Sequence, residues 1–308
     1  MSFKEIFIDP WDIHFAAYWP ILVMSFFVTA ACGLVGNYLV LRKISLVGDA
    51  ISHSVLPGIA IAYMIAGSRS DLPMFIGALI AGILTTLIIE LIHSRSKIKQ
   101  DAAIGITFTT MFAIGVILVS VYGADTDLDL DCVLFGKLDF IASKEKVFLG
   151  LPQIVLTMGI ILLAIVFLIV LFYKELLVSS FDPNFASTLG IKPRFVHYCL
   201  MCSLSVVVVS AFSSVGAILV IAMLILPAAT VYLLTDKLWL MMILSVVHSF
   251  LSSMIGLHLT VALQVSTAPA CVVAGMSLFI TTWIISPKYG LLRHFSNSFD
   301  LSTFQKEN

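Results

Sequence analysis

Long apolar stretches separated by short polar segments run through the whole chain. They lie at about 18–40, 51–67, 72–92, 102–122, 150–173, 196–212, 215–234, 238–258 and 268–286. About 20 apolar residues span a bilayer as a helix, and an open sheet cannot satisfy its backbone hydrogen bonds in lipid. The pattern therefore predicts an all-α, polytopic membrane protein with eight or nine transmembrane helices. The number stays open because 196–234 is almost continuous and could hold a bent or re-entrant piece.

Composition narrows the class of protein further. Of the 308 residues, 60% are hydrophobic and only 11% are charged, whereas soluble domains carry about 25% charged residues. A soluble globular protein is excluded, and no room is left for a soluble catalytic domain. The net charge of -1 gives no indication of a nucleic-acid partner. The sequence contains neither a G-x-x-x-x-G-K-[ST] phosphate loop nor an HExxH zinc-protease motif. If ATP drives this protein, hydrolysis must occur on another subunit.

The basic residues predict the orientation of the chain. With the N-terminus outside, twelve of the 17 Lys and Arg residues fall on the inner face and five on the outer face, which follows the positive-inside rule. We therefore expect an outer aromatic segment at 1–17, a transmembrane domain at 18–287 and a cytoplasmic tail at 288–308. The long loop at about 123–149 would lie outside, and its acidic run, Asp125–Asp131, lacks the Gly and Glu of an EF-hand.

The stretch Leu41–Gly67 holds the most informative polar residues. Asp49 and His53 are four positions apart, so a helix places both on one face, about 6 Å from each other. A carboxylate at the centre of a membrane helix costs roughly 2.5–3.5 kcal/mol and usually faces an interior or a water-filled path. A carboxylate and an imidazole together suit manganese, iron or zinc better than magnesium. From the residues alone, a structural role is equally open, with Asp49 capping its helix and His53 bonding to a neighbouring helix.

Pro57 and Gly58 follow this pair directly and predict a helix break near the site. Pro57 has no N–H, so the carbonyl of His53 loses its usual partner. Interruptions of membrane helices tend to occur where backbone lines a cavity. Two side chains are too few for a tight metal site, but a two-fold dimer would double them to two Asp and two His.

A second signal lies on the inner side of the membrane. Asp182 and Pro183 form a good helix start, with Asp as N-cap and Pro as the first helical residue. The short apolar face that follows ends at Gly190 and consists of Phe185, Ala186 and Leu189. The pattern alone favours an ordinary interfacial helix over a docking element for a cytoplasmic partner.

Several motifs, taken together, resemble the permease subunits of bacterial ATP-binding cassette (ABC) importers for manganese, zinc and iron. The resemblance covers about Tyr38 to Pro287 in the family's order. It rests on GDAISHSVLPG at Gly48–Gly58, DAAIGITF at Asp101–Phe108, DLDCVLFG at Asp129–Gly136, FDPNFASTLGIKP at Phe181–Pro193 and VGAILVIAMLILPAAT at Val215–Thr230.

This resemblance implies a fold, a site and partners. It implies a type II importer-like permease in the bacterial inner membrane, with Asp49 and His53 as its metal-coordinating pair. The segment Phe181–Gly190 would be the coupling helix that docks into the ATPase. Expected partners are a second permease chain, two cytoplasmic ATPase subunits and an extracytoplasmic metal-binding protein. No permanently bound cofactor is expected, because the manganese, iron or zinc ion is the cargo.

The sequence leaves two other functions open, together with the roles of three further groups of polar residues. A proton-coupled metal carrier without an ATPase, or a membrane scaffold that moves nothing, would also suit the composition. His248 and His258 could flank a metal path or could make interhelical hydrogen bonds. Glu90 is expected to reach the membrane interface. Cys199 and Cys202 form C-x-x-C inside an apolar stretch and are expected to be buried small residues.

Overall fold

The computed structural model describes residues 15–67, 71–122, 138–143, 146–148, 150–286 and 290. Most of the expected outer segment 1–17 and tail 288–308, and the acidic run in the outer loop, lie outside the described residues. The described elements are α3 (Phe15–Leu41), α4 (Val47–Ala66), α5 (Asp71–Arg95), α6 (Gln100–Tyr122), η1 (Leu138–Ser143), β1 (Lys146–Phe148), β2 (Leu151–Pro152), α8 (Gln153–Leu171), α9 (Tyr173–Phe181), α10 (Pro183–Thr188), α11 (Pro193–Val215), α12 (Ala217–Tyr232), α13 (Leu238–Leu263) and α14 (Thr267–Ile285).

Every apolar stretch of the sequence forms a helix. Eight of the described helices are long and apolar enough to cross a membrane, and α12 is a shorter apolar helix beside them. The continuous stretch at 196–234 is divided by Gly216, whose φ of 80° ends α11 and permits α12 to begin in a new direction. The fold class is confirmed: the protein is an all-α, multi-pass membrane protein.

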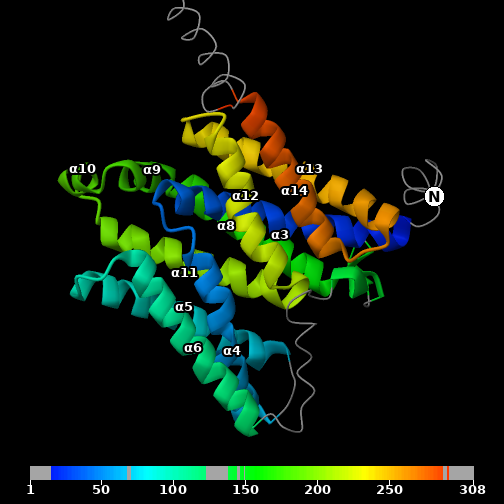
Figure 1. Cartoon of the computed structure of the whole chain (residues 1–308), viewed down its shortest axis with the longest axis horizontal. Coiled ribbons are helices and arrows are strands. Elements are labelled where there is room, and N and C mark those ends of the chain that lie inside the picture. Colours follow the sequence, from blue (N-terminus) through cyan, green and yellow to red (C-terminus); the bar gives the residue numbers. More distant parts are fainter. Residues whose placement is uncertain are drawn as a thin grey trace, which may run out of the picture.

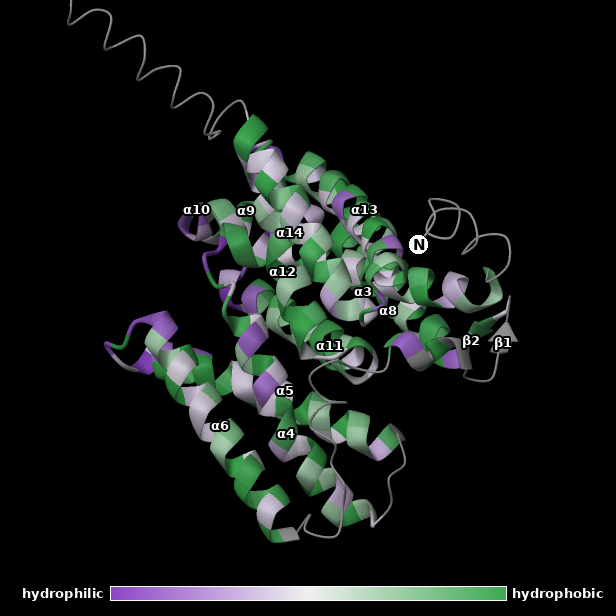
Figure 2. Ribbon diagram, turned by 45° about the vertical axis from the view of Figure 1, so that its right-hand side comes forward, coloured by the Kyte–Doolittle hydropathy of each residue, from purple (hydrophilic) through white to green (hydrophobic). Residues whose placement is uncertain are grey.

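The helices pack as two groups joined by α11 (Figure 1). In the central group, α3 packs against α12 and α13, and α14 packs against α12 and α13. In the α4–α6 group, α4 packs against both α5 and α6, and the three helices extend away from the central group (Figures 1 and 2). Because α11 contacts α3 and α12 as well as α4 and α5, it lies between the two groups.

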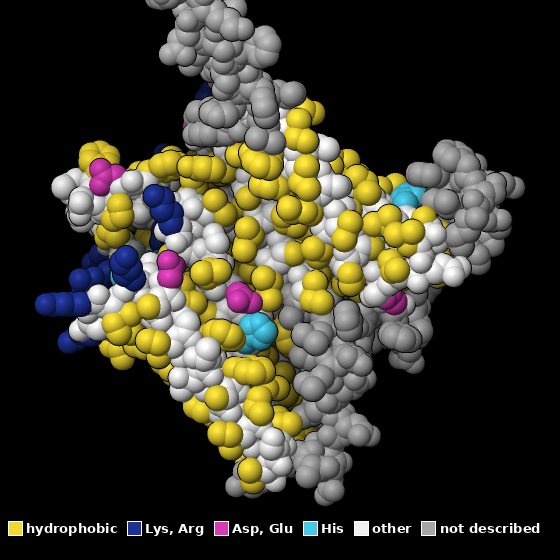
Figure 3. Space-filling view, in the orientation of Figure 1, with side chains coloured by type: hydrophobic (Ala, Val, Ile, Leu, Met, Phe, Trp, Pro, Cys, Tyr) yellow, Lys and Arg dark blue, Asp and Glu magenta, His cyan; other side chains and the backbone are white. Residues whose placement is uncertain are grey.

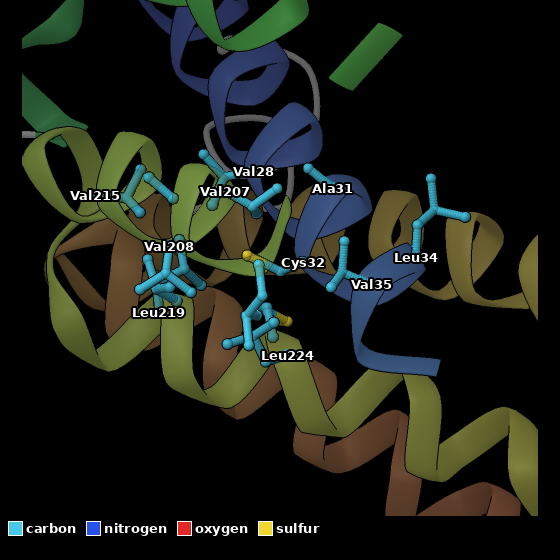
Figure 4. Close-up of a cluster of buried hydrophobic side chains, with 14 of the residues drawn as sticks. Val28, Ala31, Cys32, Leu34, Val35, Val207, Val208, Val215, Leu219 and Leu224 are labelled. Atoms are coloured by element: carbon cyan, nitrogen blue, oxygen red, sulfur yellow. The ribbon is translucent and has the colours of Figure 1, made fainter. Parts of the chain in front are cut away.

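The apolar core is concentrated where α3 meets α11 and α12. Figure 4 shows small and branched side chains from these three helices pointing toward one another. They include Val28, Cys32 and Val35 of α3, all at most 1% exposed, together with Val208 of α11 and Leu219 of α12. Small residues let helix backbones approach closely, which is how helices associate in lipid.

The basic side chains gather at one end of the molecule, over the ends of α5, α6, α10 and α11 (Figure 3). The exposed cations there include Arg95, Lys97, Lys99, Lys192 and Arg194. All five belong to the set that the charge rule assigns to the inner face. We therefore refer to this end as the inner end.

Candidate metal site

The first turns of α4 bring Asp49 and His53 together. The helix begins at Val47, so the two residues lie one turn apart, and His53 Nε2 lies 3.4 Å from Asp49 Oδ1. Their side chains stay 38% and 33% exposed, respectively, although the residues between them are buried. The pair therefore lies on a face of α4 that the rest of the described chain leaves open.

Helix α6 supports the imidazole from one side. The ring of His53 lies 5.2 Å from that of Phe108 and 5.8 Å from that of Phe112, centroid to centroid. The second contact is edge-to-face, at 85°. Aromatic contacts of this kind restrict a ring to few orientations. His53 is thus held by α6 on one side and faces Asp49 on the other.

Asp49 does not cap the helix. The N-cap position of α4 is Leu46, whose side chain makes no capping hydrogen bond, and Asp49 lies inside the first turn. The positive end of the helix dipole stabilises a carboxylate there. The purely structural explanation for the pair, a capping Asp and a His bonded to another helix, is therefore not what the described residues show.

The helix break expected at Pro57 and Gly58 is absent. Helix α4 continues from Val47 to Ala66 through both residues. Their role is close packing: a Cβ on Gly58 would overlap the backbone carbonyl of Gly77 in α5, and a Cβ on Gly115 of α6 would lie 2.8 Å from Pro57 Cδ. The two residues therefore fix where α5 and α6 cross α4, one turn beyond His53, and the prediction of a break was wrong.

One chain supplies only part of a metal coordination shell. Among the described residues, no group of three or more His, Cys, Asp and Glu side chains could hold a metal ion. Neither His248 nor His258 completes the Asp49–His53 pair, and His258 Nδ1 lies 2.7 Å from the carbonyl oxygen of Met254 in its own helix. Asp49 and His53 can offer one carboxylate and one imidazole to a divalent cation, and the remaining ligands must come from elsewhere.

The inner segment after α9 folds as the sequence predicts. Helix α10 begins at Pro183, and Asp182 Oδ1 accepts hydrogen bonds from the backbone N–H groups of Asn184 (3.0 Å) and Phe185 (2.9 Å). Gly190 ends the segment with a φ of 80°. Of its apolar residues, Ala186 is buried, whereas the large ones are more than half exposed: Phe181, Phe185 and Leu189.

Sequence reasoning missed a polar cluster beside this segment. The Glu90 carboxylate, near the inner end of α5, lies 3.2 Å from His197 Nε2, and both side chains are about one-fifth exposed. The two residues are too far apart in the chain for any periodicity to pair them. Cys199 and Cys202 are exposed on α11, so the expectation that they are buried was wrong.

Comparisons with known proteins agree with this architecture. The model of the ABC 3 transport family matches residues 15–286. The chain is 41% identical over 275 residues to the manganese transport system membrane protein MntD of Bacillus subtilis (strain 168), covering 88% of this chain and 93% of MntD. It is 42% identical over 275 residues to the zinc transport system membrane protein TroD of Treponema pallidum (strain Nichols), covering 89% and 75%, respectively.

A solved structure has the same fold. The structure of PsaBC from Streptococcus pneumoniae in complex with Fab matches with a TM-score of 0.77 at 36% identity, over 95% of this chain and 99% of that one. The family match therefore extends over the nine apolar helices and over the site on α4. This chain belongs to the ABC 3 transport family.

Proposed function

We propose that the chain is the membrane permease of an ATP-binding cassette importer that moves manganese, iron or zinc into the cytoplasm. The observation that carries the proposal is the Asp49–His53 pair, 3.4 Å apart and open on a membrane helix. Charged or ionisable side chains inside a membrane usually mark an ion path. Relatives named for manganese and zinc transport support the same class of cargo.

A second permease chain would complete the metal site. Two chains related by a two-fold axis through the open face of α4 would bring two carboxylates and two imidazoles around one ion. Each chain supplies only two ligands, so the ion is released when the two chains separate on one side. A transporter needs this weak, temporary binding, because a closed tetrahedral cage would retain the ion.

Helix α10 would receive the motion of the ATPase. ATP hydrolysis requires other subunits, because the chain has no phosphate loop. The segment Phe181–Gly190 presents Phe181, Phe185 and Leu189 to the outside at the inner end. Exposed aromatic and aliphatic side chains on a short, capped helix suit insertion into a groove of a partner protein. An extracytoplasmic binding protein would deliver the ion at the opposite end.

The transport cycle follows from these parts. The ion enters from outside and is held briefly by Asp49 and His53 of two chains. Closure of the ATPase pair moves α10, and the helices at the inner end separate so that the ion can leave toward the cytoplasm. The described residues contain a second acid–imidazole pair, Glu90 and His197, but its imidazole also lies 3.3 Å from the Arg42 guanidinium, a positive charge that disfavours a cation there.

Metal uptake by the reconstituted transporter tests this proposal. We expect ATP-driven uptake of Mn²⁺, Fe²⁺ or Zn²⁺ into proteoliposomes to fall at least tenfold in Asp49→Asn and in His53→Ala. Asp101→Asn is the matched control, because Asp101 is also an acid in the first turn of a membrane helix and is exposed. Undiminished uptake by Asp49→Asn, or uptake driven by a pH gradient without ATP, would contradict the proposal.

A further inference from the structure

A partly buried arginine at the inner end, Arg42, joins α3 to α9. Arg42 follows the last residue of α3, and its guanidinium lies against the last turn of α9. Arg42 Nη2 donates to Ser179 Oγ (2.9 Å), and Arg42 Nε donates to Ser180 Oγ (3.1 Å). Burial lowers the pKa of Arg42, but an arginine stays charged at neutral pH. Two neutral hydroxyls alone do not balance a partly buried positive charge.

His197 lies between Arg42 and the carboxylate of Glu90 and contacts both. Arg42 Nη1 lies 3.3 Å from His197 Nδ1, and His197 Nε2 lies 3.2 Å from Glu90 Oε2. Arginine has no acceptor, so His197 Nδ1 must accept, and its Nε2–H then donates to Glu90. This arrangement requires the neutral imidazole in a single tautomer.

The network links Arg42 to a carboxylate without direct contact. No ion pair among the described residues joins the guanidinium to a carboxylate, and its hydrogen-bonded path to one runs through His197 to Glu90. Hydrogen-bonded chains of this kind polarise one another in a low-dielectric environment. Removing His197 or Glu90 therefore leaves the partly buried guanidinium without its link to a carboxylate, which is unfavourable.

The network joins the end of α3 to α9, α11 and α5. These elements connect helix α10 with the α4–α6 group, which carries the candidate metal ligands. Ser179 and Ser180 lie at the end of α9, which leads through Asp182 directly into α10. Glu90 lies on α5, which packs against α4 through the backbone contact at Gly58 and Gly77. A displacement of α10 thus has a continuous route of hydrogen bonds and packed backbone to the helix that carries Asp49 and His53.

We propose that Glu90, His197 and Arg42, with Ser179 and Ser180, transmit the movement of α10 to the α4–α6 group. They act as positioning residues, and none of them contacts the ion. The inference rests on the proposed function, because it assigns a task to parts of the same transport cycle. A route for coupling is established by showing energetic coupling between its members, so the test measures that coupling.

The first test uses the whole transporter, permease with its ATPase, in proteoliposomes. We expect Arg42→Gln to lower the maximal rate of ATP-driven Mn²⁺ uptake at least tenfold. The KM for Mn²⁺, equilibrium Mn²⁺ binding and basal ATP hydrolysis should stay within twofold. Lys43→Gln is the matched control, because Lys43 is the neighbouring cation and is exposed. A loss of Mn²⁺ binding in parallel with uptake would indicate a structural defect and would overturn the inference.

Two substitutions at His197 separate transmission from folding. In His197→Gln, the amide can donate to Glu90 and accept from Arg42, so we expect at least half of the uptake rate to remain. His197→Phe fills a similar space but makes neither bond, and uptake should fall at least tenfold in complexes that still assemble. Equal uptake by the two variants overturns the inference, even if Arg42→Gln does not assemble.

A double variant tests whether residues that do not touch each other act together. If Arg42 and Glu90 belong to one route, the uptake of Arg42→Gln/Glu90→Gln should equal that of the more severe single variant. Multiplied losses would mean that they act independently and would overturn the inference. Full uptake by Asp49→Asn together with a loss in Arg42→Gln would instead reject the metal site and leave the transmission route standing.

Discussion

The central group and the α4–α6 group are both membrane-helix bundles, but they are held together differently. In the central group, side chains bond from one helix to the next: Asn37 Nδ2 donates to Ser245 Oγ (2.9 Å), and Ser252 Oγ donates to the carbonyl of Cys271 (2.7 Å). In the α4–α6 group, the buried hydroxyls of Ser52, Thr85 and Thr107 return to their own helices. No side-chain hydrogen bond among the described residues joins α4, α5 and α6 to one another.

Burial differs between α3 and α6 but does not separate the two groups, since α4 and α13 are equally buried, with 50% of the residues in the most apolar window of each. In the most apolar window of α3, 78% of the residues are buried inside the chain, against 22% for α6. Helix α3 is thus enclosed by its own chain, whereas most residues in the window of α6 are not buried, and α6 lies at the edge of the bundle (Figure 2). Close backbone contacts occur in both groups, at Gly36 against Leu224 and at Gly58 against Gly77, so the difference lies in the hydrogen bonds between helices, which the group with the candidate metal ligands lacks among the described residues. Such backbone contacts fix where the helices cross.

The largest expected effect comes from separating α4 and α5 at their crossing. Gly58→Leu places a side chain where the carbonyl of Gly77 lies, and backbone cannot yield as a flexible side chain can. We expect a loss of about 3 kcal/mol of stability or more, the upper part of the range for overpacking. The measurement is the thermal unfolding midpoint of the permease in detergent, followed by tryptophan fluorescence.

A glycine in open space provides the control for this substitution. A Cβ added at Gly105 of α6 meets no atom within 4 Å, so Gly105→Leu should leave the midpoint nearly unchanged. Equal midpoints for the two leucine variants would show that the Gly58–Gly77 contact does not hold the α4–α6 group together.

The sequence predicts most of this fold because membrane helices are specified locally. Apolar length alone located all nine apolar helices, and the Asp182–Pro183 pair located the start of α10, since capping depends on residues a few positions apart. The Asp49–His53 pair was predictable for the same reason: four residues make one helical turn. The expected break at Pro57 failed because a neighbouring helix, not the local sequence, decides what a proline and a glycine do. In this fold, the two residues admit Gly77 and Gly115.

Contacts between distant helices were not predictable. Glu90 and His197 lie on α5 and α11, and only the path of α11 between the two groups brings them together. The exposed side of Cys199 and Cys202 depends equally on which face of α11 its neighbours cover. A single sequence carries no signal for such pairs, because helical periodicity gives a face but not the helix that packs on it.

Removing a single buried hydroxyl from each group should have the smallest effect on stability. Ser252→Ala removes a hydrogen bond between α13 and α14, and such interhelical bonds average about 0.6 kcal/mol in a membrane protein. Ser52→Ala is the matched variant in the α4–α6 group: the same atom is lost, the residue is 2% exposed, and its bond goes to Gly48 in its own helix. The thermal midpoint in detergent should fall more for Ser252→Ala than for Ser52→Ala. The reverse order would mean that side-chain hydrogen bonds between helices do not distinguish the central group from the α4–α6 group.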